Sequence, residues 1–137
     1  MRIFFDSTAF VKRYVAEAGT EAVLALCDRA DELVLSVIAV PELISAFCRL
    51  RREGTISDAD YGQLKRELMA DVVDAMVCDV AHDVVAKSVE SLERGVLRGM
   101  DAIHVGSAYI TRCDLFVSSD ARQCEAAIRA GLAVERV

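Results

Sequence analysis

The sequence of 137 residues is long enough for one domain of ordinary size and too short for two, so we expect a single domain over residues 1–137. With 54% hydrophobic and 28% charged residues, one proline and seven glycines, the chain is not disordered, collagen-like or of low complexity. Its net charge of −6 excludes nucleic-acid binding through bulk positive charge, so contact with a polyanion would need a local basic patch or a bound cation.

Strand-like apolar runs alternate with helical patterns in the first half of the chain. The helix that ends at residue 52 has two possible first residues. Either Ser36 caps the helix and Pro41 lies inside its first turns, or Pro41 is its first residue. The elements expected here are a strand at 2–6, helices at 8–16 and 21–30, a strand at 32–36 and the helix ending at 52.

The same alternation continues to the end of the chain. The expected elements are a helix at 57–73, a strand at 75–80, helices at 82–94 and 99–111, a strand at 114–118, a helix at 121–130 and a strand at 132–137. This order predicts an α/β fold of three layers, α/β/α, with a mostly parallel sheet of four to five strands. In such sheets a ligand binds beyond the carboxyl ends of the strands.

The cysteines and the N-terminal segment favour a cytoplasmic protein. The five cysteines are odd in number and form no C-x-x-C pair, which argues against a disulfide framework or a zinc site. The first apolar run reaches a carboxylate after three residues, which does not fit a secretory signal, and no apolar run approaches the ~18 residues of a membrane span. Four cysteines lie in apolar segments and are expected to be buried, as in a reducing compartment: Cys27, Cys48, Cys78 and Cys124.

Four acidic residues from distant parts of the sequence map to the carboxyl edge of the predicted sheet. Asp6 ends the first strand, Asp120 follows the fourth, Glu42 lies early in the helix after the second, and Asp101 opens the helix before the fourth. Each alone has an ordinary explanation as an N-cap, a first-turn acid or a solvated side chain. Together they are less ordinary, because Asp6 follows an apolar run and Asp101 lies in a largely apolar helix, positions that face an interior or a cleft.

Converging carboxylates restrict the chemistry of a site. They cannot all stay ionised without compensation, so they become protonated or share a cation. An all-oxygen cluster prefers Mg²⁺ or Mn²⁺, which acidifies a water and neutralises a phosphate, the chemistry of phosphodiester hydrolysis. The sequence holds no G-x-S-x-G or G-x-x-x-x-G-K motif that would offer a competing chemistry.

Each of the four acids lies in a segment that resembles part of a known family. The segments are FFDSTAFVKRY, VPELISAF, LRGMDAIHVGSA and FVSSDARQ, and their order and spacing cover the chain. On these segments the sequence resembles the PIN domains, specifically the VapC-type toxin ribonucleases of toxin–antitoxin systems. It departs from the family at the last segment, where Ser118 stands for the usual Thr and Arg122-Gln123-Cys124 follow in place of an early apolar residue.

The resemblance implies a Mg²⁺-dependent endoribonuclease, with Mn²⁺ as a possible substitute. Asp6 and Asp101 would be the principal metal ligands, Glu42 would complete the site directly or through water, and Asp120 would hold a second ion or orient a water. The implied partners are an RNA substrate, a cognate antitoxin protein and a second copy of the chain in a homodimer, with no membrane.

Other polar residues near the acids have two interpretations each. The hydroxyls of Ser7 and Ser118 bond the carboxylates or are ordinary turn caps. His104, on the same helix face as Asp101, steers that carboxylate or is a partly buried structural residue. The basic residues Arg49, Arg51 and Arg52 contact RNA or a partner, or they balance the negative end of their helix. Lys12 and Arg13 follow Asp6 by one to two turns and are candidates for contact with a phosphate near the metal.

Two other functions remain open. A PIN-fold binding protein without catalysis would lack metal binding, although the presence of all four acids argues against it. A receiver-like signalling module would need an adjacent acidic pair after the first strand and a Lys near the last, whereas Asp6 is followed by Ser7 and no Lys follows Lys87.

Overall fold

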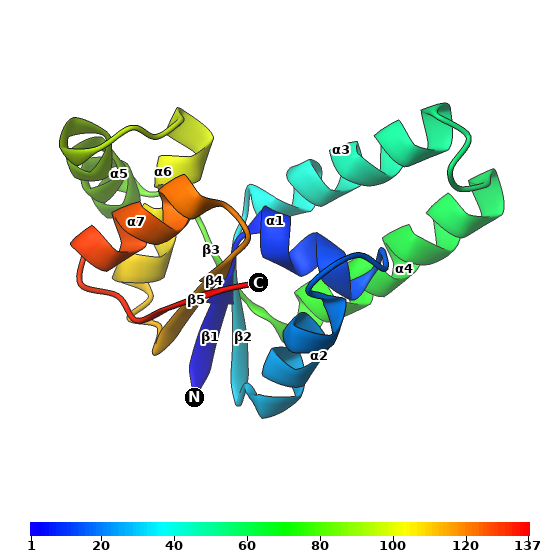
Figure 1. Cartoon of the computed structure of the whole chain (residues 1–137), viewed down its shortest axis with the longest axis horizontal. Helices are drawn as coiled ribbons and strands as arrows, with labels where there is room; N and C mark the ends of the chain where they lie inside the picture. The colour runs from blue at the N-terminus through cyan, green and yellow to red at the C-terminus, as the bar shows by residue number, and fades with distance from the viewer.

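A five-stranded sheet lies between two layers of helices in the computed structural model, which describes all 137 residues (Figure 1). The sheet has the order β3-β2-β1-β4-β5, and every neighbouring pair is parallel. The predicted α/β class with three layers is therefore confirmed. The strands are β1 (Arg2–Phe5), β2 (Glu32–Ser36), β3 (Met76–Cys78), β4 (Leu115–Ser118) and β5 (Val134–Arg136).

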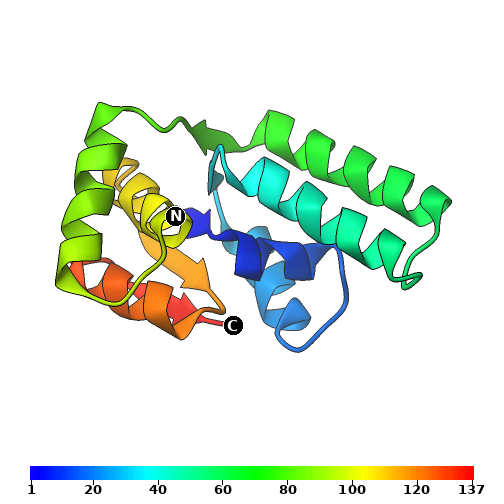
Figure 2. The same cartoon turned by 90° about the horizontal axis from the view of Figure 1, so that it is seen from above.

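The helices divide between the two faces of the sheet. Figures 1 and 2 show α1 to α4 on one side and α5 to α7 on the other, with α3 and α4 side by side as a long hairpin. None of them combines the length and the apolar character that a membrane span requires. They are α1 (Ser7–Phe10) with a following 3-10 turn η1 (Val11–Arg13), α2 (Thr20–Arg29), α3 (Ala39–Arg52), α4 (Asp58–Asp74), α5 (His82–Arg94), α6 (Gly99–Ile110) and α7 (Ala121–Arg129).

The central strand β1 supplies both cores. Because successive side chains of a strand point to opposite faces, Ile3 and Phe5 join a cluster of twelve buried residues under α1 to α4, while Phe4 joins a cluster of seven under α6 and α7. Both faces of the strand are buried, which explains why its sequence is apolar without alternation.

The order of the strands reverses beside β1. The chain runs from β1 outward to β2 and β3, and then returns to place β4 on the other side of β1, with Phe5 in register with Val117. In parallel sheets this reversal leaves a crevice at the carboxyl ends of the two strands, where a ligand site is expected. Asp6 and Asp120 follow these two strands directly.

The helix predicted at 8–16 is shorter than expected because tertiary contacts interrupt it. Within η1 the Lys12 ammonium donates to the backbone carbonyls of Ala18 (2.7 Å) and Val137 (3.1 Å). The next side chains, Arg13 and Tyr14, both bond Asp71 on α4. These contacts draw the chain out of the helix before its predicted end.

Two other predictions from the sequence concern the start of α3 and the cysteines. Helix α3 starts at Ala39, so Pro41 lies inside its first turn, and Ile38 rather than Ser36 occupies the N-cap position. All five cysteines are unpaired, as expected, but only Cys124 is buried. The expectation of burial is wrong for the other three, which are half-buried: Cys27, Cys48 and Cys78.

Candidate active site

Asp6 is fully buried at the start of α1 and is held on both carboxylate oxygens. The Thr8 hydroxyl donates at 2.8 Å, the Ser118 hydroxyl donates to Oδ2 at 2.8 Å, and the Ala9 amide donates to Oδ1 at 2.9 Å. Burial raises the pKa of Asp6 above its usual value, although His104 and these hydrogen bonds oppose the rise. The bond from Ser118 confirms that this hydroxyl holds a carboxylate.

Glu42 forms the second part of the site, in the first turn of α3. Its Oε1 accepts hydrogen bonds from the Ser7 hydroxyl at 2.8 Å and from His104 Nε2 at 2.6 Å. Burial alone would raise the pKa of Glu42, but the contacts with His104 and Ser7 hold it below its usual value. The imidazole of His104 is buried and hydrogen-bonds Glu42 rather than Asp101, whose pKa it lowers by its charge.

Asp101 and Asp120 form the third part, at the first turns of α6 and α7. Asp120 caps α7, and its Oδ1 accepts the amides of Arg122 (2.8 Å) and Gln123 (3.2 Å). Asp101 Oδ1 accepts the side-chain amide of Gln123 at 3.1 Å. Burial raises the pKa of Asp101, and the negative charges of Asp120 and then Glu42 raise it further.

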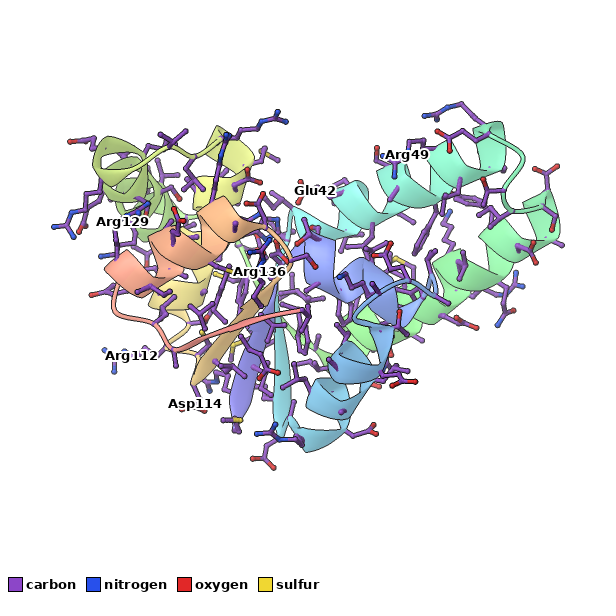
Figure 3. The ribbon with its side chains drawn as sticks, in the orientation of Figure 1. Glu42, Arg49, Arg112, Asp114, Arg129 and Arg136 are labelled. Carbon is purple, nitrogen blue, oxygen red and sulfur yellow. The ribbon has the colours of Figure 1, made fainter.

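A groove of about 630 Å³ opens beside these acids. Both Glu42 and Asp101 line it, together with Arg98 and apolar side chains from α5 and α6. Figure 3 shows Glu42 at the start of α3, above the carboxyl ends of the strands, and Asp114 at the opposite end of the sheet. Glu42, which lines the groove, therefore lies at the same edge of the sheet as Asp6 and Asp120, which follow β1 and β4.

The donor set suits a hard divalent cation, but it is not assembled as a ligand shell. Glu42, Asp101 and Asp120 each bond the protein through one carboxylate oxygen and leave the other without a hydrogen bond from the chain. Oxygen donors of this kind fit Mg²⁺ or Mn²⁺. No three His, Cys, Asp or Glu side chains lie close enough together to hold a metal ion in this arrangement. The joint role of the four acids as ligands stays a prediction.

The basic residues near the acids are largely committed to the fold. Arg13 forms an ion pair with Asp71 at 2.8 Å, and the Lys12 ammonium is buried against backbone carbonyls, so both charges have partners within the fold. Arg51 stacks over the ring of Tyr61 at 4.2 Å. Arg49 lines a second groove, of about 530 Å³, next to Thr8.

Gln123 contacts both Asp101 and Asp120, a role that was not predicted from the sequence. One signal was available: Gln123 stands three residues after the N-cap Asp120, the position from which a side chain reaches back in a capping box. Its actual partner lies on another helix, which no local pattern identifies.

The family profile described as the PIN domain matches residues 3–129, so the chain belongs to the PIN domain family. Among curated proteins it is similar to Ribonuclease VapC45 of Mycobacterium tuberculosis, with 26% identity over 106 residues that cover 77% of this chain and 74% of the relative. The expected resemblance to VapC-type proteins is thereby confirmed.

Solved structures share the fold over nearly the whole chain. VapC20 of Mycobacterium tuberculosis, described as a sarcin–ricin loop cleaving toxin, aligns with a TM-score of 0.70 and 15% identity, covering 98% of this chain and 99% of that one. A toxin–antitoxin complex from Klebsiella pneumoniae gives the same TM-score of 0.70, with 15% identity and the same coverage of 98% and 99%. At these identities the comparison shows the fold.

Proposed function

We propose that the chain is a Mg²⁺-dependent endoribonuclease and the toxin of a type II toxin–antitoxin pair. The observation that carries the proposal is the concentration of negative charge at the carboxyl edge of the sheet, where Asp101 lies among Asp120 and Glu42. Such a cluster calls for a compensating cation. The similarity to proteins named VapC ribonucleases supports RNA as the substrate.

In this proposal Asp6, Glu42, Asp101 and Asp120 hold the ion. The bound ion would lower the pKa of a water and neutralise the charge of an RNA phosphate. Thr8 and Ser118 keep the Asp6 carboxylate in one orientation, and Ser7 and His104 do the same for Glu42.

Asp120 accepts two backbone amides through Oδ1, and its Oδ2, which receives no hydrogen bond from the chain, would orient the attacking water. In-line attack of that water on the phosphate would leave a 5′-phosphate on one product. Arg98, which lines the acidic groove and lowers the pKa of Asp101 by its charge, would face the RNA backbone.

Cleavage of a structured RNA by the purified chain tests the proposal. We expect cleavage with Mg²⁺ or Mn²⁺, none with a chelator, and a loss of about a thousandfold in Asp6→Asn and in Asp101→Asn, because several kcal/mol of charge stabilisation are removed. Asp114→Asn, at the opposite end of the sheet, is the matched control and should cleave normally. Metal-independent cleavage that survives in both site variants would contradict the proposal.

One observation favours the alternative of a PIN-fold binding protein without catalysis, namely the lack of three preassembled metal ligands. Calorimetry with Mn²⁺ in the absence of RNA separates the two functions. Uptake of Mn²⁺ that Asp101→Asn abolishes supports the nuclease, and no uptake supports the binding protein. The receiver-like alternative is set aside, because the chain belongs to the PIN domain family.

We also propose a cognate antitoxin and a homodimer as partners. Apolar side chains on one face of α5, Val85, Val89 and Leu92, are partly exposed along the acidic groove. They suit a protein partner. Co-purification with the product of an adjacent short gene, and a dimer mass in light scattering, are the expected results.

A further inference from the structure

Gln123 connects the two acidic helices of the site. It is the third residue of α7 and is only 1% exposed. Its backbone amide donates to Asp120 Oδ1 at 3.2 Å, and its side-chain Nε2 donates to Asp101 Oδ1 at 3.1 Å. A single residue therefore bonds the carboxylates of two different helices.

The hydrogen bond from Gln123 to Asp101 counteracts the repulsion between Asp101 and Asp120. Asp101 and Asp120 are half-buried like charges, and the charge of Asp120 works against the ionised form of Asp101. The amide orientation follows from chemistry, because the reversed amide would set Oε1 against a carboxylate oxygen, two acceptors facing each other. The Gln123 side chain is the one hydrogen-bond donor that Asp101 receives from the chain.

The core does not explain a glutamine at this position. Gln123 Oε1 is buried without a hydrogen-bond partner, which lowers the stability of the fold. Its neighbours along the buried face of α7 are the small side chains of Cys124, Ala126 and Ala127. An apolar side chain of the same length would fill the space without the unpaired acceptor.

We propose that Gln123 is a positioning residue that holds Asp101 beside Asp120 through Oδ1 and leaves Asp101 Oδ2 without a hydrogen bond from the chain, so that this oxygen would be free to bind a cation. This inference rests on the proposed function and adds a residue to it. Residues that orient metal ligands in this way set metal affinity, and their replacement typically lowers it about 10–100-fold.

The test compares Gln123→Met with Gln63→Met. Methionine keeps the length of glutamine but has no amide donor, and Gln63 is exposed on α4, so its variant controls for the substitution itself. Mn²⁺ affinity is measured by calorimetry without RNA, and the melting temperature is measured without metal. For Gln123→Met we expect Mn²⁺ binding weakened about tenfold at an unchanged or raised melting temperature, with RNA cleavage restored by raised Mn²⁺.

The outcomes separate this inference from the proposed function. If the parent chain binds Mn²⁺ and Gln123→Met binds it equally well, or if binding falls only together with the melting temperature, the positioning role is overturned while the nuclease stands. If the parent chain neither binds Mn²⁺ nor cleaves RNA, both are overturned.

A second measurement is made on the parent chain and does not depend on how well Gln123→Met folds. In the parent chain we expect the side-chain amide protons of Gln123 to exchange slowly with solvent in NMR spectra, and those of Gln63 to exchange fast. Asp101→Ala should speed the exchange at Gln123. Fast exchange at Gln123 in the parent chain would contradict the contact on which the inference rests.

Discussion

The two helical layers that cover the sheet differ in how well they satisfy their buried polar groups. In the layer of α1 to α4, Asp71 accepts hydrogen bonds from Arg13 at 2.8 Å and from Tyr14. In the opposite layer three buried side-chain atoms have no hydrogen-bond partner, and all three lie on α6 and α7: His104 Nδ1, Ser107 Oγ and Gln123 Oε1.

The unpaired buried atoms lie on the helices that carry part of the acidic site. Helices α6 and α7 carry Asp101 and Asp120, and they pack on the smaller of the two cores, with seven buried residues against twelve. Natural proteins commonly give up stability where a functional site needs charge in a confined place. The α6–α7 layer therefore holds two of the four acids and all three unpaired atoms, whereas the α1–α4 layer packs on the larger core.

The largest effect should come from Gly106, where α5 and α6 cross. A Cβ there would lie 2.6 Å from Ser88 Oγ and 2.8 Å from the Val84 carbonyl oxygen, and the backbone of α5 cannot yield. We expect Gly106→Ala to lower the free energy of unfolding by about 3 kcal/mol. Gly99→Ala, in open space at the start of the same helix, should raise it by about 0.5–1 kcal/mol. Urea unfolding of both variants measures the two changes. Equal changes in the free energy of unfolding would show that α5 and α6 can move apart to admit the added methyl group.

The next largest effect is expected in the α1–α4 layer, where the Asp71 carboxylate is hydrogen-bonded. Burial alone would raise the pKa of Asp71, but the bonds from Arg13 and Tyr14 hold it below its usual value. Asp71→Asn should lower the free energy of unfolding by about 2 kcal/mol at neutral pH.

The pH dependence of that loss has a defined sign. Because the folded pKa of Asp71 lies below the unfolded value, about 3.9, its contribution is complete above that pH and disappears as the pH falls through the folded pKa. Stability curves of the parent chain and Asp71→Asn should therefore run parallel from neutral pH down to about 4 and converge below it. Convergence already near neutral pH would contradict the assignment.

The smallest effect is expected from Asp101→Asn, and it has the opposite sign. Asparagine keeps an acceptor for the Gln123 amide and removes the like charge beside Asp120. The free energy of unfolding of the metal-free protein should rise by about 0.2–1 kcal/mol, although RNA cleavage is lost. A fall in the free energy of unfolding would show that the charge of Asp101 does not destabilise the α6–α7 layer. The proposed difference in stability between the two layers would then lose its support.

Much of this architecture is predictable from the sequence. Periodicity and helix breakers place the strand Glu32–Ser36 and the helix His82–Arg94 as observed, and most other elements within one or two residues. The end of the first helix is not predictable, because it depends on bonds from Lys12 to Val137 and from Arg13 to Asp71, which are far apart in sequence.

The candidate site divides in the same way. The four acids are visible as residues that follow strands or open helices, and Ser118 and Ser7 are visible as hydroxyls beside them. The bond from His104 to Glu42 and the bridge from Gln123 to Asp101 depend on how separate helices pack, and a single sequence carries no pattern for such contacts.

The pairing of β1 with β4 has a consequence for how the molecule is made. The hydrogen bond from Ser118 to Asp6 joins residues 112 positions apart, so it cannot form before β4 has been synthesised. A polypeptide still emerging from the ribosome therefore carries its first acid long before the last strand can dock beside it. Any activity of this edge of the sheet begins only with the finished chain, and fragments that stop short of β4 should be inert.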